Sequence, residues 1–531
     1  MRLSPHDLEQ MDEAYLRSLE PEALRAVSER LLQDLKELYE RLHQTPRNSS
    51  LPPSSRPAYL GQLDEATAAV PAEAAGTAEA TAADADQTAV SEVASPPYQE
   101  AAADRSQLDL GGTAGSSPQP ARRPGKPLGA PGHGRTQVIP PQTIHYHQAS
   151  HCAACGVALP AEAPLESRLG FYTLDLELGT AAQPGLRVLC TLHYYGDTTC
   201  PCGHQTRTPP TVTAEALVET GASVTGLSEW RLVGPLLAAL IVCLALRMRL
   251  SRAPIQEWLK DWFQLELSIG LITQVIHEAG LAAAPVTEQL LEELRQADLL
   301  QVDETPWKEH GHVLWLWVFV TATVVLFVVG RRTRQVLQQV LTEAFAGWLM
   351  SDGHLNYRDY PRRWRCLAHL ERKARGLCES VDREAQAFGQ GALLVLKVVF
   401  QPVRDGPDPT VYHPLLRLFR DYCQLHHDLP HEKAQALARE FLNDWDAIWA
   451  VLEHPDLPAT NNVAEQALRH WVIARLISQG TRTPQGSRVF SILASVIETC
   501  RVRKILPWPY LASVIAERRQ GHPAPPLPAA A

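Results

Sequence analysis

Cysteine is sparse in this sequence, with ten residues in a chain of 531. This density excludes a small scaffold held together by disulfides. The chain begins MRLSPHDLEQMDEAYL and lacks the apolar core of a cleavable signal peptide. We therefore expect a reducing cytoplasm, where closely spaced cysteines more often bind metal than form disulfides.

An overall basic charge is also missing, since the formal net charge is -10. The excess of acidic residues is concentrated in one segment, because residues 60–110 contain ten acids and one arginine. Basic residues gather elsewhere, with seven Arg or Lys against two acids in 358–375 and seven against one in 469–504. Such clusters are often only solvated faces, but two of them in one chain favour a polyanionic partner.

Two apolar runs, residues 232–248 and 313–330, approach the length that spans a membrane. The second is rich in Val, Trp and Phe and is interrupted by Thr321 and Thr323, which predicts two buried strands joined by a tight turn. The first starts near a Gly-Pro pair and predicts a buried helix. We therefore expect no membrane partner.

The amino-terminal part has two contrasting segments. Residues 7–44 are predicted to be helical, with leucines at steps of four and three. This spacing fits a short coiled coil that self-associates, and equally an amphipathic helix packed on the protein. Residues 46–142 are rich in Ala, Pro, Ser, Gly and acids, so we expect a disordered linker that cannot bury enough apolar surface to fold.

Two close pairs of cysteines, in HCAACG and CPCGH, flank about forty residues of strand-like alternation. Their four thiolates are enough for one tetrahedral zinc ion. They belong to Cys152, Cys155, Cys200 and Cys202. The second pair is unusually tight, so Cys190 and His204 remain alternative ligands. A structural zinc would stabilise a small β-rich module over residues 143–215 that has little core of its own.

Residues 216–285 are predicted to be mostly helical. Within them a helix over 254–263, a short turn and a second helix beginning at Ser268 have helix-turn-helix spacing, with Ser268 as the N-cap. This spacing favours a DNA-binding region.

Two aspartates are predicted to lie on neighbouring strands. In LLQVDETPW, Leu300 and Val302 face one side of a strand and Asp303 the other, and the Glu-Thr-Pro that follows is predicted to end the strand. Two further strands and a helix over 333–341 precede Asp352, which ends a fourth short apolar run. Adjacent positions in one sheet would bring the two carboxylates together.

A third acid, Glu465, lies in PATNNVAEQALR at the start of a predicted helix. Its spacing fits a reciprocal capping arrangement with Asn462 as the N-cap. The same glutamate could complete a metal site, because phosphodiester hydrolysis and transfer use two divalent ions held by a few carboxylates.

Four motifs in this order resemble the DDE transposase domain of the insertion sequence 66 family: LLQVDETPW, SDGHLNYRDY, CLAHLERKA and NNVAEQALRHWVIARLISQGTRTPQGS. The segment NSSLPPSSRP and the paired-cysteine module resemble other regions of that family. The resemblance implies an α/β fold with an RNase H-like catalytic core over 286–515 and a mostly helical insertion over about 371–455. The zinc-binding module, the helical DNA-binding region and an N-terminal coiled-coil helix would precede it, and a disordered tail over 516–531 would follow.

The resemblance further implies that Asp303, Asp352 and Glu465 hold two Mg²⁺ ions, for which Mn²⁺ can substitute. Cys366 and His369 match a Cys-x-x-His element of the family, which we interpret as structural because two ligands alone do not make a zinc site.

Basic side chains beside the acids, Arg469, Arg475 and Arg482, could contact DNA phosphates. The sequence departs from the family's usual pattern at His354, where an aromatic residue is common, and at Gln466, where arginine is frequent. CLAHLERKA also lacks the usual tryptophan. These departures concern substrate detail, because all three acids are present.

The predicted function is therefore a DNA transposase that binds the ends of its mobile element and catalyses metal-dependent cleavage and strand transfer. The alternative is a catalytically inactive or domesticated DNA-binding relative. We expect DNA at the element ends and target, further copies of the chain and accessory proteins of the same element as partners. The expected location is the cytoplasm, at the nucleoid.

Overall fold

The computed structural model describes residues 11, 13–42, 139–160, 163–208, 232–342, 345–403 and 408–529. The linker expected over 46–142 lies outside the described residues except for its last four positions, and so does the motif NSSLPPSSRP.

The predicted amino-terminal helix is divided in two, α2 (Glu13–Ser18) and α3 (Pro21–Leu42). The break precedes Pro21, a residue suited to the first turn of a helix because it has no N–H to leave unsatisfied. Leu35 and Leu38 on α3 are 64% and 54% exposed. Near the end of the helix, Glu40 lies 3.1 Å from both His431 and Lys433. The described contacts therefore leave much of the leucine seam uncovered.

The cysteine module is a small sheet of strands β1 (Thr143–His147), β2 (Leu165–Leu178), β3 (Leu186–Thr199) and β4 (Gln205–Arg207). β2 and β3 form a long antiparallel hairpin, with β1 and β4 paired to β3. Around the cysteine pairs the buried cluster consists only of Cys152, Leu159 and Cys200. This end of the module therefore has almost no apolar core.

Three helices follow, α6 (Pro235–Leu246), α7 (Arg252–Phe263) and α8 (Ile269–Arg295). The predicted N-cap at Ser268 is confirmed, because its hydroxyl accepts from the Leu271 N–H at 3.2 Å. α8 continues ten residues past the boundary expected at 285.

Among the described residues, one helix, α8, is long and apolar enough to cross a membrane by length and composition. Half of its most apolar window is buried inside the protein, as in a core helix. The run over 232–248 forms α6, whose apolar residues are mostly buried. The run over 313–330 forms two strands, as predicted.

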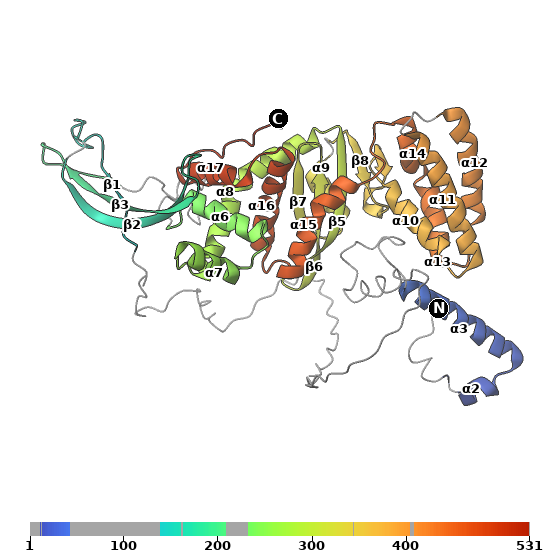
Figure 1. The fold of residues 1–531 in the computed structure, drawn as a ribbon. Helices are drawn as coiled ribbons and strands as arrows, with labels where there is room; N and C mark the ends of the chain where they lie inside the picture. The colour runs from blue at the N-terminus through green and yellow to red at the C-terminus, as the bar shows by residue number, and fades with distance from the viewer. Residues whose placement is uncertain are drawn as a thin grey trace, which may run out of the picture. The chain divides into compact units, whose positions relative to one another are not determined.

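A five-stranded sheet forms the centre of the chain, and Figure 1 shows helices on both sides of it. Its strands are β5 (Leu299–Glu309), β6 (His312–Val320), β7 (Val325–Gly330), β8 (Trp348–Ser351) and β9 (Arg363–Arg365). Their order is β7-β6-β5-β8-β9, with the first three antiparallel and the pairs β5–β8 and β8–β9 parallel. α9 (Arg334–Leu341) connects β7 to β8.

Alternating side chains divide the sheet into two buried faces. Val302 and Trp317 belong to the large core with α8 and α9. On the opposite face Leu316 and Val318 belong to a second cluster with residues of α15 (Asn462–Ser478) and α16 (Pro484–Val502). Asp303 alternates with Val302, so it belongs to the face that α15 covers.

The prediction that Glu-Thr-Pro ends the first strand is wrong, because β5 runs through Pro306 to Glu309. Pro306 pairs with Trp315 of β6. β8 pairs only with residues 299–301 of β5, so beyond this point β5 is an edge strand. An edge position tolerates proline because no ladder partner requires its missing N–H.

The helical insertion between β9 and α15 contains α10 (Leu367–Cys378), α11 (Arg383–Val403), α12 (Pro409–Leu425), α13 (Glu432–Asn443) and α14 (Trp445–Glu453). Its apolar core includes Phe388, Phe419 and Phe441, together with Met350 of β8 and Trp364 of β9. In Figure 1 these helices form a bundle beyond the side of the sheet where β8 and β9 lie.

The disordered tail expected over 516–531 is a further error. α17 (Pro507–Arg519) includes its first four residues. Residues 520–529 then pack on the core, with Leu527 buried and its carbonyl accepting from Arg503 at 3.2 Å. The Pro- and Ala-rich composition concealed this contact because a single buried leucine leaves little signal in sequence.

A buried ion-pair network joins the sheet to the insertion. Arg365 of β9 is fully buried and pairs with Asp444, while its other Nη donates to Glu440 at 2.5 Å. Lys373 donates to the same glutamate at 2.7 Å, and Arg363 to Asp444 at 2.8 Å.

Replacing Asp444 with alanine should destabilise the insertion by about 3–5 kcal/mol, because it leaves the Arg365 charge buried without its partner. Urea unfolding followed by tryptophan fluorescence measures the loss. Asp446→Ala removes the same charge from an exposed position two residues away and is the control. Equal unfolding midpoints for the two variants would contradict this account.

Candidate functional site

The sheet brings Asp303 and Asp352 to one place. Gln301 of β5 is paired with Met350 of β8 in parallel register, and each aspartate lies two residues further along its own chain segment. Both carboxylates therefore leave the same face at the same end of neighbouring strands. Burial raises the pKa of Asp303 well above its usual range, and nearby negative charges, including those of Asp352 and Glu465, raise it further.

Glu465 comes to the same site on α15, but not as a helix cap. The N-cap is Asn461, not Asn462, so Glu465 is the fourth helical residue rather than the third. The side chain of Asn461 makes no capping bond and instead donates to the Val302 carbonyl at 2.9 Å. The capping prediction is therefore wrong. The N-cap residue is Asn461, and its side chain binds the strand instead of the helix N–H groups.

Residues of α10 surround the Glu465 carboxylate. Arg372 Nη2 donates to Glu465 Oε1 at 2.8 Å, and His369 Nε2 lies 3.7 Å from the same oxygen. Burial, aided by the charge of Arg372, lowers the pKa of His369 to about 4, so the imidazole is neutral at physiological pH. Cys366 Sγ accepts from the Asn461 N–H at 3.2 Å.

Three interacting side chains, Glu304, Arg332 and Tyr357, lie near Asp352. Arg332 pairs with Glu304 at 2.7 Å, lies 3.8 Å from Asp352 and rests 4.2 Å over the Trp315 ring. Tyr357 donates its hydroxyl to Glu304. Burial, followed by the charge of Asp352, raises the pKa of Glu304 to about 7.

Sequence reasoning missed Glu304, Arg332, Tyr357 and Arg372. The signal available was weak: an acid directly after Asp303, and an arginine one helical turn after His369. The role of either residue can be inferred only after the fold shows which side chains it contacts.

Gly353, directly after Asp352, is confined by the ion-pair network of the insertion. A Cβ at this position would lie 2.4 Å from Glu440 Oε1 and 2.5 Å from Arg365 Nη2. The loop that carries Asp352 thus packs closely against that network.

The three arginines expected to contact DNA have different environments. Arg469 and Arg482 are exposed. Arg475 donates to the Thr305 hydroxyl at 3.0 Å and to the Pro306 carbonyl, so it ties α15 to β5.

The basic cluster over 358–375 is largely occupied by internal ion pairs. Arg358, Arg363 and Arg365 surround Asp444, Arg372 pairs with Glu465, Lys373 with Glu440 and Arg375 with Glu371. Most of these basic residues are therefore paired with acidic residues of the same chain. Fewer of them are available to bind a polyanion than the sequence indicates.

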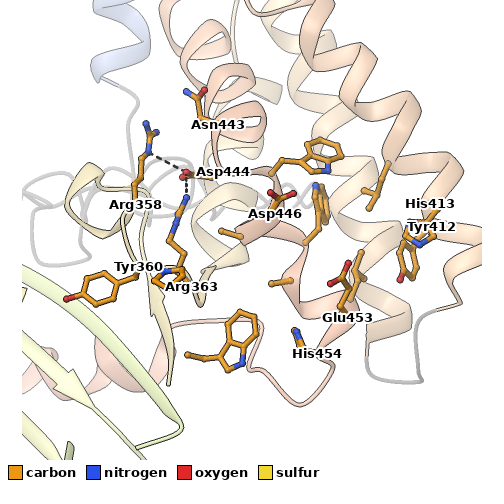
Figure 2. Close-up of a pocket in the computed structure, with 18 residues that line it drawn as sticks. Arg358, Tyr360, Arg363, Tyr412, His413, Asn443, Asp444, Asp446, Glu453 and His454 are labelled. Carbon is orange, nitrogen blue, oxygen red and sulfur yellow. Dashed lines mark hydrogen bonds and ion pairs between the residues drawn. The ribbon is translucent and has the colours of Figure 1, made fainter. Parts of the chain in front are cut away.

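A cavity of about 510 Å³ lies between this ion-pair network and the insertion helices. Figure 2 shows Asp444 at its wall, joined to Arg358 and Arg363. Its described lining is mixed, with tryptophans, two histidines and several acids, and does not include Asp303, Asp352 or Glu465. The carboxylate site is thus separate from this cavity.

The four predicted cysteines form one cluster whose sulfur atoms all lie within 4.8 Å of one another. Cys152 and Cys202 are 3.7 Å apart, and Cys155 and Cys200 are 3.6 Å apart. Sulfurs bound 2.3 Å from a tetrahedral zinc would be separated by about 3.8 Å, so this cluster could hold zinc. The Cys155 N–H lowers the pKa of Cys152 to about 6, whereas burial and the neighbouring thiols raise the pKa of Cys200 to about 12, so Cys152 is the readier thiolate for zinc.

The two alternative zinc ligands are outside this cluster. Cys190 is buried in the main core and points its sulfur toward the Ile139 carbonyl, 3.6 Å away. His204 is exposed. Its backbone carbonyl accepts a hydrogen bond from the Cys200 N–H.

Comparison with known proteins gives two findings. An uncharacterized protein, y4jD, of Sinorhizobium fredii (strain NBRC 101917 / NGR234) is 23% identical over 237 residues, which cover 40% of this chain and 44% of that protein. The chain thus spans less than half the length of this relative. Residues 231–489 match the model of the Transposase IS66 family, a range that contains Asp303, Asp352 and Glu465. The part of the chain over residues 231–489 is therefore a transposase domain of the IS66 family.

Proposed function

We propose that this chain is a DDE-type transposase, in which Asp303, Asp352 and Glu465 form the active site of an RNase H-like core. The observation that carries the proposal is the convergence of three carboxylates from β5, the end of β8 and α15. Burial raises the pKa of Asp303, and the charges of Glu304, Asp352 and Glu465 raise it further. The strand order, with three antiparallel strands followed by two parallel ones, supports the fold assignment.

The donor set suits Mg²⁺, or Mn²⁺ in its place, because all three candidate ligands are hard carboxylate oxygens. Two such ions would activate the attacking oxygen and stabilise the leaving oxygen of a phosphodiester. The protein supplies the geometry: Asp303 from a rigid strand, Asp352 from a loop braced by Arg365 and Glu440, and Glu465 from a helix tied to β5. Charge repulsion among the acids raises their affinity for cations.

DNA binding would use elements beside this site. Arg469 and Arg482 are exposed on and after α15, and phosphate contacts from such residues position DNA without reading its sequence. α7 and α8, with Ser268 between them, are the proposed helix-turn-helix. We propose DNA at the element ends and target as the substrate, and a homo-oligomer, aided by accessory proteins of the element, as the active assembly.

The described elements support the proposed division of the chain. We propose a zinc module over 143–215, a helical DNA-binding region over 216–285 and a catalytic domain over 286–515. The described strands β1 to β4 fall in the first, α6 and α7 in the second, and α8 crosses the boundary at 285. The insertion extends from α10 to α14.

Removing any one of the three charges should abolish strand cleavage and joining while sparing DNA binding. Glu465→Gln, Asp303→Asn and Asp352→Asn should each reduce cleavage by at least about 100-fold, because transition-state electrostatics are lost. Gel shift and cleavage assays on DNA carrying the element end separate the two properties. Asp359→Asn, at an exposed position, is the control.

If Glu465→Gln cleaves normally while Asp303→Asn is inactive, the third ligand lies elsewhere. If the unaltered chain binds the element end but shows no cleavage with Mg²⁺ or Mn²⁺, the inactive DNA-binding alternative is correct.

The purified chain should contain one zinc ion, held by Cys152, Cys155, Cys200 and Cys202. Cys155→Ser should lose the zinc and make the module sensitive to protease, since few apolar contacts hold this end together. Cys190→Ser should keep the zinc, because that sulfur lies outside the cluster. Metal analysis that finds no zinc in reduced protein, or its loss in Cys190→Ser, would disprove the assignment.

The exposed leucine seam of α3 should mediate self-association. Replacing Leu35 and Leu38 with serine should lower the mass measured by light scattering, because both side chains would be covered in a coiled coil. Arg25→Ser, on an exposed position of the same helix, should leave the mass unchanged. An unchanged mass after deletion of residues 1–45 would instead show that the helix packs within its own chain.

A further inference from the structure

One face of α10 is directed at the start of α15. His369 and Arg372 are three residues apart and lie on the same side of the helix, and Cys366 is its N-cap residue. Cys366 Sγ accepts from the Asn461 N–H at 3.2 Å, and Arg372 donates to Glu465 at 2.8 Å. The Cys-x-x-His element is thus the first half of a Cys-x-x-His-x-x-Arg face.

Cys366, His369 and Glu465 also resemble a metal site, because one ligand atom from each lies within 4.8 Å of the others. Arg372 argues against this role. Its Nη2 lies 2.8 Å from Glu465 Oε1 and 3.4 Å from His369 Nε2, so a cation already contacts two of the three ligand atoms. The arrangement fits an arginine-bound carboxylate better than a bound metal.

The guanidinium of Arg372 is itself held in place. Its Nε donates to the Ala368 carbonyl at 3.2 Å, and its side chain is 20% exposed. Among the described contacts of the Glu465 carboxylate, those from Arg372 and His369 both reach Oε1. Oε2 is therefore the oxygen better placed to serve a metal.

We propose that Arg372 is a positioning residue for the third acid: it fixes Glu465 through Oε1, presents Oε2 to the metal and balances the carboxylate charge before metal binds. This inference rests on the proposed role of Glu465 as a metal ligand.

Two consequences of opposite sign follow from this geometry. A charge-assisted hydrogen bond restricts the carboxylate to one orientation, which favours catalysis. The same positive charge close to the ligand opposes the approach of a divalent cation. Removal of the Arg372 charge should therefore strengthen metal binding and slow cleavage at saturating metal.

The experiment uses the full-length, zinc-loaded protein and Mn²⁺ as the probe. Free Mn²⁺ is measured by electron paramagnetic resonance, and cleavage of element-end DNA is measured across the same Mn²⁺ range. The variants are Arg372→Gln, Arg372→Lys, Glu465→Gln and, as the matched control, Arg375→Gln. Arg375 lies on the same helix and pairs with Glu371 at 2.6 Å on its exposed side.

Arg372→Gln should bind Mn²⁺ more tightly, on the order of 10-fold, while its maximal cleavage rate falls about 10-fold or more. Arg372→Lys keeps the charge and should bind Mn²⁺ as the unaltered protein does, with a cleavage rate between the two. Arg375→Gln should change neither property.

Each contrary result has a distinct meaning. If Arg372→Gln behaves as Arg375→Gln does while Glu465→Gln loses Mn²⁺ binding, the positioning role is wrong and the proposed function stands. If Arg372→Gln loses Mn²⁺ affinity and rate together, with a lower melting temperature, the residue is merely structural. If Glu465→Gln binds Mn²⁺ and cleaves normally, the proposed function fails at this residue. A second zinc that is lost in Cys366→Ser would replace the positioning role with a metal site.

Discussion

The hydrogen bond from the Asn461 side chain to the Val302 carbonyl is the contact on which the carboxylate site depends. β8 pairs with β5 only as far as Gln301, so the next carbonyl has no neighbouring strand to satisfy it. Asn461 is fully buried and supplies the missing donor at 2.9 Å. A buried carbonyl without a partner would be costly, so the bond fixes the start of α15 beside β5. Glu465 follows one helical turn later and is thereby brought to Asp303.

The helical insertion is joined to this site by charge as well as by chain connectivity. Glu440 and Asp444, at the end of α13, reach back to Arg365 on the last strand of the sheet. Gly353 packs against the same pair, so the loop after Asp352 has little room to move. α10 contributes Arg372 to the third acid. The insertion thus contacts Glu465 and lies close to the glycine that follows Asp352, and its apolar core includes Met350 and Trp364 of the sheet.

Sequence patterns succeeded where local chemistry agreed with the fold. Alternation in LLQVDETPW placed Asp303 opposite Leu300 and Val302, and the Thr-rich break in 313–330 marked the turn between β6 and β7. They failed where a distant partner decided the outcome. Pro306 lies within a strand because β8 is too short to reach it, and Asn462 does not cap its helix because Asn461 is bound to β5. The carboxyl-terminal residues pack because Arg503 binds their carbonyls.

By itself, the sequence determined the strand that carries Asp303, the short strand that ends before Asp352, the helix that carries Glu465 and the paired cysteines. Each of these follows from periodicity or spacing over a few residues, which short-range sterics and burial control. Only the tertiary structure decided that Arg475 binds β5, that the basic cluster over 358–375 is largely paired within the chain, and that Arg372 contacts Glu465. Apart from the local pair of Arg375 and Glu371, these contacts join groups more than sixty residues apart in sequence. Such groups interact only after the fold has brought them within a few ångströms of each other.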